Sequence, residues 1–257
     1  MKNTIIIEKE KIELKNPVLI EGLPGLGMVG KITVKYLIEQ LKAKKFAELY
    51  SPHFAYYVLV NNEGNIKLLR NEFYYWKNNS GGNDLILLTG DSQAQTIEGQ
   101  YEVANAILEF AKEKNVKLVI TVGGYRRDVT DTPKVLASAT SPEALRKALE
   151  AGSQSNSPGS PIVGAAGLLV GLAKLKDIEG ICLLGETPGY MPDPKAAKSV
   201  LTILKEMLNL KIDLTDLDKE IYRIAQIEEQ MKRIEEQRKI AEREVRRIEE
   251  EKTSYIG

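Results

Sequence analysis

The sequence predicts an α/β domain with a mostly parallel sheet that carries helices on both faces, followed by a long charged helix. Short apolar runs bounded by glycine-rich turns alternate with segments of helical periodicity over residues 17–208. By contrast, residues 213–252 contain no glycine or proline and are dominated by Glu, Lys and Arg. We therefore expect a globular domain at 1–212, a coiled-coil-type helix at 213–252 and a flexible tail at 253–257.

The elements nearest the start of the chain follow from local patterns. Residues 17–20 form an apolar run that ends in a glycine-rich turn, which is typical of a strand. Apolar residues recur at nearly helical spacing over 31–44, so a helix is expected there. The runs 56–60 and 65–69 predict two strands, and the Asn-Asn-Glu-Gly sequence at 61–64 predicts a hairpin turn between them.

The middle of the chain continues the alternation. An aromatic cluster at 73–76 leads into a loop, and the apolar run 84–89 predicts a buried strand. Residues 99–114 have the periodicity of an amphipathic helix, and 117–122 predict the next strand. A further strand is expected at 134–139.

The last third of the domain follows the same plan. Ser141, which stands before Pro142 and Glu143, is a good N-cap for a helix. The Ser, Pro and Gly content of 154–161 predicts a loop, and 162–175 predict a buried helix of small residues. A strand at 180–184 and a helix at 193–208 complete the domain.

Composition excludes several classes of function. Lys plus Arg and Asp plus Glu are balanced at 36 each, which argues against nucleic acid and an anionic membrane as partners. The single cysteine, Cys182, and single histidine, His53, cannot supply the usual zinc ligand sets. We expect no metal, no cofactor and no disulfide, and a cytoplasmic location.

Glycine-rich exits follow several predicted strands, where ligands bind in parallel sheets. The glycines at 25, 27 and 30 match a dinucleotide-binding fingerprint between a strand and a helix. Glu48 stands near the position of a ribose-binding acid. The candidate ligand residues are Gly25, Gly27, Gly30, Asp91, Gly124 and Glu186. A nucleotide, an anion at the helix N-terminus, and close packing of the helix on the strand remain alternatives.

The charged helix has one narrow apolar stripe. Its apolar residues recur in steps of three and four, as in a coiled-coil seam. We expect the stripe to carry self-association through Ile224, Ile227, Met231, Ile234, Val245 and Ile248. The heptads do not fix the number of subunits.

Four segments together resemble one family. They read GLPGLGMVG at 22–30, GDSQ at 90–93, VGGY at 122–125 and GETPGYMPDPKAA at 185–197. In this order they are similar to the archaeal branch of the proteasome assembly chaperone 2 family. That resemblance implies a nucleoside-phosphorylase-like α/β fold without an enzymatic activity, and a role in assembling the proteasome core or binding its α-ring.

The resemblance also suggests how a partner would be bound. Proteins that dock on the α-ring often end in a hydrophobic residue, Tyr and one final residue, whereas Tyr255 is third from the end and follows Ser254. The leading hypothesis is a homo-oligomeric chaperone or adaptor that presents Tyr255, Ile256 and Gly257 to proteasome α subunits. The alternatives are a nucleotide- or phosphometabolite-binding enzyme or sensor, and a scaffold for a paralogous chaperone.

Overall fold

The computed structural model describes residues 1–128 and 132–254, without the side chains at 228, 232, 235 and 239–254. The chain divides into two compact units, Met1–Leu214 and Thr215–Gly257.

A nine-stranded mixed sheet forms the centre of the first unit. Its order is β1-β3-β6-β7-β2-β8-β11-β9-β10. The strands are β1 (Ile5–Glu8), β2 (Val18–Glu21), β3 (Lys44–Tyr50), β6 (Asn71–Trp76), β7 (Leu85–Gly90), β8 (Leu118–Arg126), β9 (Val135–Ala139), β10 (Gln154–Ser155) and β11 (Glu179–Thr187).

The four central strands, β7, β2, β8 and β11, are parallel to one another, as predicted. The flanking pairs β1–β3, β3–β6, β6–β7 and β11–β9 are antiparallel, so the sheet is mixed. The central strands are continuous apolar runs because helices bury both of their faces.

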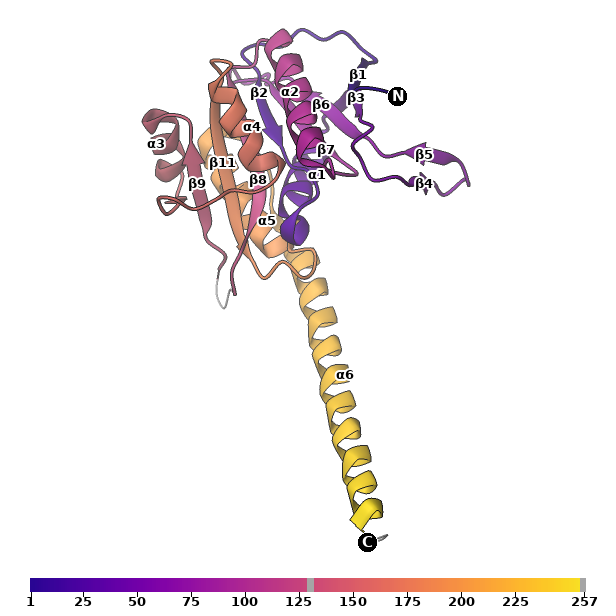
Figure 1. Ribbon diagram of the computed structural model, residues 1–257. Helices are drawn as coiled ribbons and strands as arrows, with labels where there is room; N and C mark the ends of the chain where they lie inside the picture. The colour runs from indigo at the N-terminus through magenta and orange to yellow at the C-terminus, as the bar shows by residue number, and fades with distance from the viewer. Residues whose placement is uncertain (129–131, 255–257) are drawn as a thin grey trace. The chain divides into compact units, whose positions relative to one another are not determined.

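Helices cover both faces of this sheet (Figure 1). On one face α1 (Val29–Leu41) packs against α5 (Pro194–Leu208), with α3 (Pro142–Glu150) beside α5. On the other face α2 (Ile97–Glu113) packs against α4 (Ala165–Lys174) over a hydrophobic core that includes Phe46, Phe73 and Phe110. The short 3₁₀ helix η1 (Leu26–Met28) lies between β2 and α1.

Polar side chains fix where three of these helices begin. Thr96, Ser141 and Asp193 accept hydrogen bonds from the backbone N–H of Gly99, Ala144 and Ala196, respectively. These bonds satisfy backbone donors that the first helical turn leaves unpaired. The predicted cap at Ser141 is therefore present.

Several strands differ from the sequence predictions. The helix predicted over 31–44 ends at Leu41 because Lys42 adopts a left-handed conformation with φ of 51°, and β3 follows directly. The aromatic cluster at 73–76 is part of β6, and the loop predicted at 154–161 begins with β10. The predicted hairpin forms as β4 (Val58–Val60) and β5 (Ile66–Leu68), which make a separate two-stranded sheet.

The second unit is the single helix α6 (Thr215–Ser254), which is 40 residues long. Exposed charge pairs such as Arg223–Glu220 and Arg233–Glu229 lie along its surface. Such pairs stabilise an isolated helix by only about 0.2–0.5 kcal/mol each. Among the helices of the described residues, none is long and apolar enough to cross a bilayer.

Candidate functional site

A cavity of about 330 Å³ opens at the carboxyl ends of β2 and β8, beside the start of α4. We refer to it as the strand-end cavity. Its lining consists of Glu21, Leu23, Gly25, Leu26, Gly30, Gln93, Val122, Gly123, Gly124, Tyr125, Arg126, Pro161, Ile162, Val163, Ala166 and Leu184. Of the six ligand residues predicted from the sequence, it brings together Gly25, Gly30 and Gly124.

The other three predicted ligand residues do not line this cavity. Gly27 is buried, and Asp193 donates a backbone hydrogen bond to its carbonyl oxygen. The Asp91 carboxylate lies 3.1 Å from the Lys67 ammonium group. The buried Glu186 carboxylate lies 3.0 Å from a guanidinium nitrogen of Arg127 and accepts a hydrogen bond from a backbone N–H. The six residues therefore do not form one site.

The glycines near β2 occupy positions where another part of the backbone approaches closely. A Cβ placed on Gly22 would lie 2.2 Å from the carbonyl oxygen of Gly30. On Gly30 it would lie 2.4 Å from the carbonyl oxygen of Val122, and on Gly124 it would lie 2.4 Å from that of Leu26. Real Cβ atoms do not approach that closely. Packing of α1 and η1 on the strands therefore accounts for these glycines without a nucleotide.

Glu21, the last residue of β2, lines the strand-end cavity although no sequence motif indicated it. Only 1% of the residue is exposed. Its Oε1 accepts a hydrogen bond of 3.1 Å from the backbone N–H of Leu23, whereas Oε2 has no partner among the described residues. Burial away from water raises the pKa of the carboxyl group to about 8, because the ionised form loses its hydration. The sequence signal was a single acid that ends an apolar strand.

The Gln93 side chain connects the glycine-rich loop to the start of α4 through two hydrogen bonds. Its side-chain Nε2 donates to the carbonyl oxygen of Pro24 over 2.8 Å, and its Oε1 accepts from the backbone N–H of Ala165 over 3.0 Å. The preceding Gly164 has a φ of 90°, which favours glycine. This side chain therefore fixes two walls of the cavity relative to each other.

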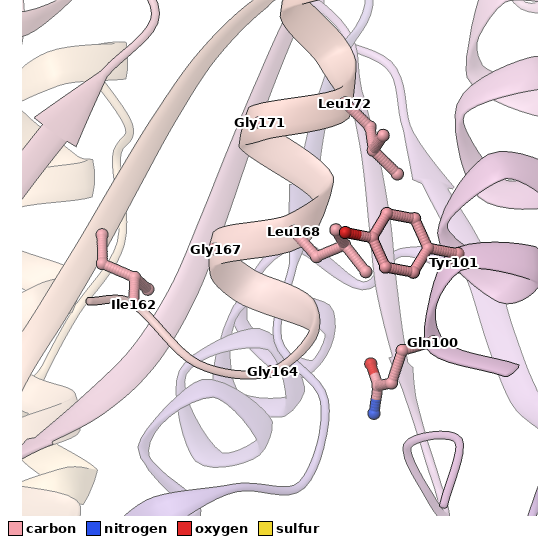
Figure 2. Close-up of a pocket in the computed structure, with 8 residues that line it drawn as sticks. All are labelled: Gln100, Tyr101, Ile162, Gly164, Gly167, Leu168, Gly171 and Leu172. Atoms are coloured by element: carbon pink, nitrogen blue, oxygen red, sulfur yellow. The ribbon is translucent and has the colours of Figure 1, made fainter. Parts of the chain in front are cut away.

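A second hollow, of about 480 Å³, lies between α2 and α4. Figure 2 shows the Tyr101 ring of α2 facing Leu168 and Leu172 of α4, with Gln100 also in the lining. Gly164, Gly167, Gly171 and Ile162 complete its lining, so the described residues around it include no charged side chain. The groove is suited to an apolar contact rather than to acid–base chemistry.

Glu48 is engaged in an ionic cluster far along the sheet from the glycine-rich loop. In the sheet order, β6 and β7 separate β3 from β2. The Glu48 carboxylate lies within 2.8–3.3 Å of side-chain nitrogens of Lys9, Lys45 and Arg70. Burial opposes ionisation here, but hydrogen bonds from Lys9, Lys45 and Tyr50 outweigh it and lower the pKa to about 2. Glu48 thus does not stand beside the glycine-rich loop as a ribose-binding acid would.

The remaining reactive side chains have structural surroundings. The His53 ring contacts Glu102 at 3.0 Å and the capping hydroxyl of Thr96 at 3.3 Å. Cys182 is buried in β11, and burial raises the pKa of its thiol to about 12. Within the described residues, no group of three or more His, Cys, Asp or Glu side chains is placed to hold a metal ion.

The described residues of the apolar stripe of α6 are half-buried or exposed in the single chain. The exposed fractions are 39% for Ile227, 55% for Met231 and 64% for Ile234, and Ile224 is half-buried. The side chains of Val245 and Ile248, and the residues Tyr255, Ile256 and Gly257, lie outside the described part of the chain. We call Ile224, Ile227, Met231 and Ile234 the described seam.

The β4–β5 hairpin carries another exposed apolar surface. Val58 pairs with Leu68 and Val60 with Ile66, so these four side chains share one face of the hairpin. Their exposed fractions range from 44% for Val58 to 74% for Ile66. Exposed contiguous apolar surface of this kind is typical of a protein interface.

Comparisons with known proteins identify the family. The PAC2 family model matches residues 19–235, which is most of the chain. The chain belongs to the PAC2 family. It is therefore a homologue of proteasome assembly chaperones, as the four sequence segments predicted.

Solved structures that are similar to this chain share its fold. PbaB of Pyrococcus furiosus, an archaeal proteasome activator, is 42% identical, with a TM-score of 0.87 over 90% of this chain and 100% of that chain. PbaA of the same organism, an archaeal homolog of proteasome-assembly chaperone, is 30% identical, with a TM-score of 0.75 over 96% and 97% of the two chains. The uncharacterized protein MJ1210 of Methanocaldococcus jannaschii is 37% identical, with 95% and 93% of the two chains covered.

Proposed function

We propose that this PAC2 protein is a non-enzymatic, cytoplasmic adaptor or assembly chaperone that works as a homo-oligomer on the proteasome core particle. The observation that carries the proposal is the exposed described seam on a 40-residue helix, in a chain similar to a proteasome activator and to a proteasome-assembly chaperone homologue. An adaptor needs surfaces for partners, and the exposed apolar residues of this chain supply them.

The described seam favours association between copies of α6. A long helix whose surface is mostly charged gains little by folding alone, because most helix stability in proteins comes from packing an apolar face. The steps of three and four between Ile224, Ile227, Met231 and Ile234 match the a and d positions of heptads. Identical helices from two or more copies would bury these side chains together as a coiled coil.

The tail would then be displayed in several copies. In this proposal Tyr255, Ile256 and Gly257 contact the partner, such as the α-ring of the core particle. Weak contacts from several linked tails bind more tightly together than singly, because linkage raises the effective concentration of each tail. Because Tyr255 is third from the end and follows Ser254, a single tail departs from the docking motif, so the proposal relies on several tails binding together.

The seam is tested by placing a charge on it. In Ile227→Asp and Ile234→Asp, burial of the aspartate would oppose helix pairing, so we expect a smaller species by analytical ultracentrifugation. Ala225→Asp introduces the same charge on the same helix but off the seam, and should leave the oligomer intact. If the protein that carries both Ile227→Asp and Ile234→Asp sedimented like the unmodified protein, the seam would not mediate association.

Partner binding is tested by co-purification with proteasome core particles and with free α subunits. We expect the full-length protein to bind and a variant that ends at Lys252 to bind much more weakly. Binding that survives truncation would move the contact to the globular unit. Failure of the full-length protein to bind either target would contradict the proteasome role and leave a paralogous chaperone as the partner to seek.

The two proposed roles differ in what binding does. An adaptor or activator should increase hydrolysis of a fluorogenic peptide by assembled core particles. An assembly chaperone should instead speed the formation of core particles from free subunits. Measuring both rates with the full-length protein and the variant ending at Lys252 separates these roles.

A further inference from the structure

The strand-end cavity combines features that the adaptor role does not use. The buried residue Glu21 is part of its lining, and in its carboxyl group Oε1 accepts a hydrogen bond from the backbone N–H of Leu23, whereas Oε2 has no partner among the described residues. Because burial raises the pKa of this group to about 8, the neutral carboxylic acid predominates at neutral pH. A neutral carboxylic acid has an O–H group to donate.

A buried O–H donor of this kind needs a hydrogen-bond partner. Buried polar groups in proteins almost always have a hydrogen-bond partner, and a buried donor without one is costly. Within the described residues, the fully buried Oε2 of Glu21 has none, and Glu21 is one of the residues that line the cavity. A molecule in the cavity that offers an acceptor, such as a carbonyl oxygen or ring nitrogen, would satisfy it.

The remaining walls suit a small apolar body. Leu23, Val122, Ile162, Ala166 and Leu184 contribute apolar side chains. Gly25, Gly123 and Gly124 expose backbone rather than side chain. The volume of about 330 Å³ lies within the range of about 300–1,000 Å³ that is usual for small-molecule sites.

The cavity also has a cationic group in its lining. The Arg126 guanidinium carbon lies 5.0 Å from the centre of the Tyr190 ring. Among the described residues, no carboxylate makes an ion pair with Arg126, whereas the neighbouring Arg127 pairs with Glu186. Both Arg126 and the adjacent Tyr125 are exposed. An anionic group at this end would meet a guanidinium that no described carboxylate neutralises.

We propose that the strand-end cavity binds a small organic anion whose apolar body carries a carbonyl or ring-nitrogen acceptor. The acceptor bonds to the Glu21 carboxylic acid, and the anionic group lies beside Arg126. This site is independent of the described seam and of the tail. It also differs from a dinucleotide site, because the contacts are made by Glu21 and Arg126 rather than by the glycine fingerprint.

The proposal is tested on the full-length protein with two probes that share this chemistry. Phenylpyruvate has a carbonyl group and a carboxylate, whereas uridine 5′-monophosphate has ring carbonyls and a phosphate. Binding of each probe is measured by isothermal titration calorimetry at pH 6.5 and pH 9.5. We expect at least one probe to bind at pH 6.5, and the stronger probe distinguishes a carboxylate from a phosphate ester.

Two substitutions isolate the role of Glu21. Glu21→Leu removes the donor and should weaken binding at least tenfold, with folding checked by circular dichroism. Glu21→Gln keeps a donor that does not titrate, so it should bind with less dependence on pH. For the unmodified protein, a pKa of about 8 predicts roughly thirtyfold weaker binding at pH 9.5, where about 3% of Glu21 remains protonated.

Comparing the unmodified protein with Glu21→Gln also separates the effect of Glu21 from that of other ionisable groups. Those that line the cavity or interact with Glu21 are Cys182 on β11, and Tyr125 and Arg126 on β8. They are unchanged in Glu21→Gln, so any pH dependence that remains in this variant belongs to them or to the probe. Binding of neither probe, full binding by Glu21→Leu, or equal pH dependence in the unmodified protein and Glu21→Gln would overturn the proposal.

Discussion

Replacing Glu21 with glutamine should make the stability of this protein less dependent on pH. Glu21 is 1% exposed, and the pKa of its carboxyl group in the folded chain is raised from 4.5 to about 8, chiefly by loss of hydration. A raised carboxyl pKa means that the folded state holds the proton more tightly than the unfolded state. The associated stability is fully present below pH 4.5 and is lost as the pH rises through about 8.

The size of the effect follows from the shift of the pKa. One pKa unit corresponds to about 1.4 kcal/mol, so ionisation of Glu21 in the folded protein costs on the order of 5 kcal/mol in total. Proton linkage places about 4 kcal/mol of this loss between pH 5 and pH 9. Glutamine retains an acceptor for the Leu23 N–H and has no charge to bury, so this part of the pH dependence should vanish.

The measurement is equilibrium unfolding by guanidinium chloride at pH 5, 7 and 9. One protein concentration is used throughout, because oligomerisation makes stability depend on concentration. The difference in unfolding free energy between Glu21→Gln and the unmodified protein should grow in favour of the variant as the pH rises. Parallel stability profiles from pH 5 to pH 9 would refute the reasoning, because they would mean that Glu21 ionises as readily when folded as when unfolded.

Three further expectations concern packing, ion pairing and association. Gly30→Ala should destabilise the chain by about 3 kcal/mol or more, because its Cβ would lie 2.4 Å from a backbone carbonyl oxygen. Gly171→Ala, whose Cβ meets no atom within 4 Å, should be neutral or stabilising by up to about 1 kcal/mol, and thermal unfolding compares the two. Glu48→Gln should lower the free energy of unfolding by about 3 kcal/mol at pH 7. The loss should be smaller in acid, because the lowered pKa of Glu48 stabilises the folded state only until the pH falls from 4.5 through about 2. Denaturant unfolding at pH 7 and pH 3 measures this difference. Met231→Asp should reduce the oligomer mass measured by light scattering, because an aspartate on the seam cannot be buried favourably, and a mass equal to that of the unmodified protein would contradict it.

The central strands were predictable because burial on both faces leaves a simple pattern. In β2, β7, β8 and β11, helices cover each face, so the sequence reads as nearly continuous apolar runs. The helices that cover them carry apolar residues at helical spacing, and the cap at Ser141 marks where α3 begins. Local pattern and long-range packing agree at these elements, so the sequence was sufficient.

The flanking strands were harder to predict because charged residues sit inside them. In β3, Glu48 is buried, yet its charge is matched by Lys9, Lys45 and Arg70 from other positions. A lone sequence shows the charges but not their pairing, so the strand resembles a polar segment. Glu21 could not be identified from the sequence for the same reason, because its interest lies in a carboxylate oxygen, Oε2, that has no partner among the described residues.

The glycine fingerprint shows why spacing alone does not identify a ligand site. A glycine permits close approach of any atom, whether it belongs to a bound phosphate or to another part of the same backbone. Here the approaching atoms at Gly22, Gly30 and Gly124 are carbonyl oxygens of the protein itself. Close packing of the backbone therefore accounts for glycine at these positions, whether or not a ligand binds nearby. The same exit region nevertheless contains an acid without a partner for Oε2 and an arginine without an ion-pair partner among the described residues. In the proposed site recognition comes from these side chains, and the glycines allow the strands, η1 and α1 to approach closely around the cavity.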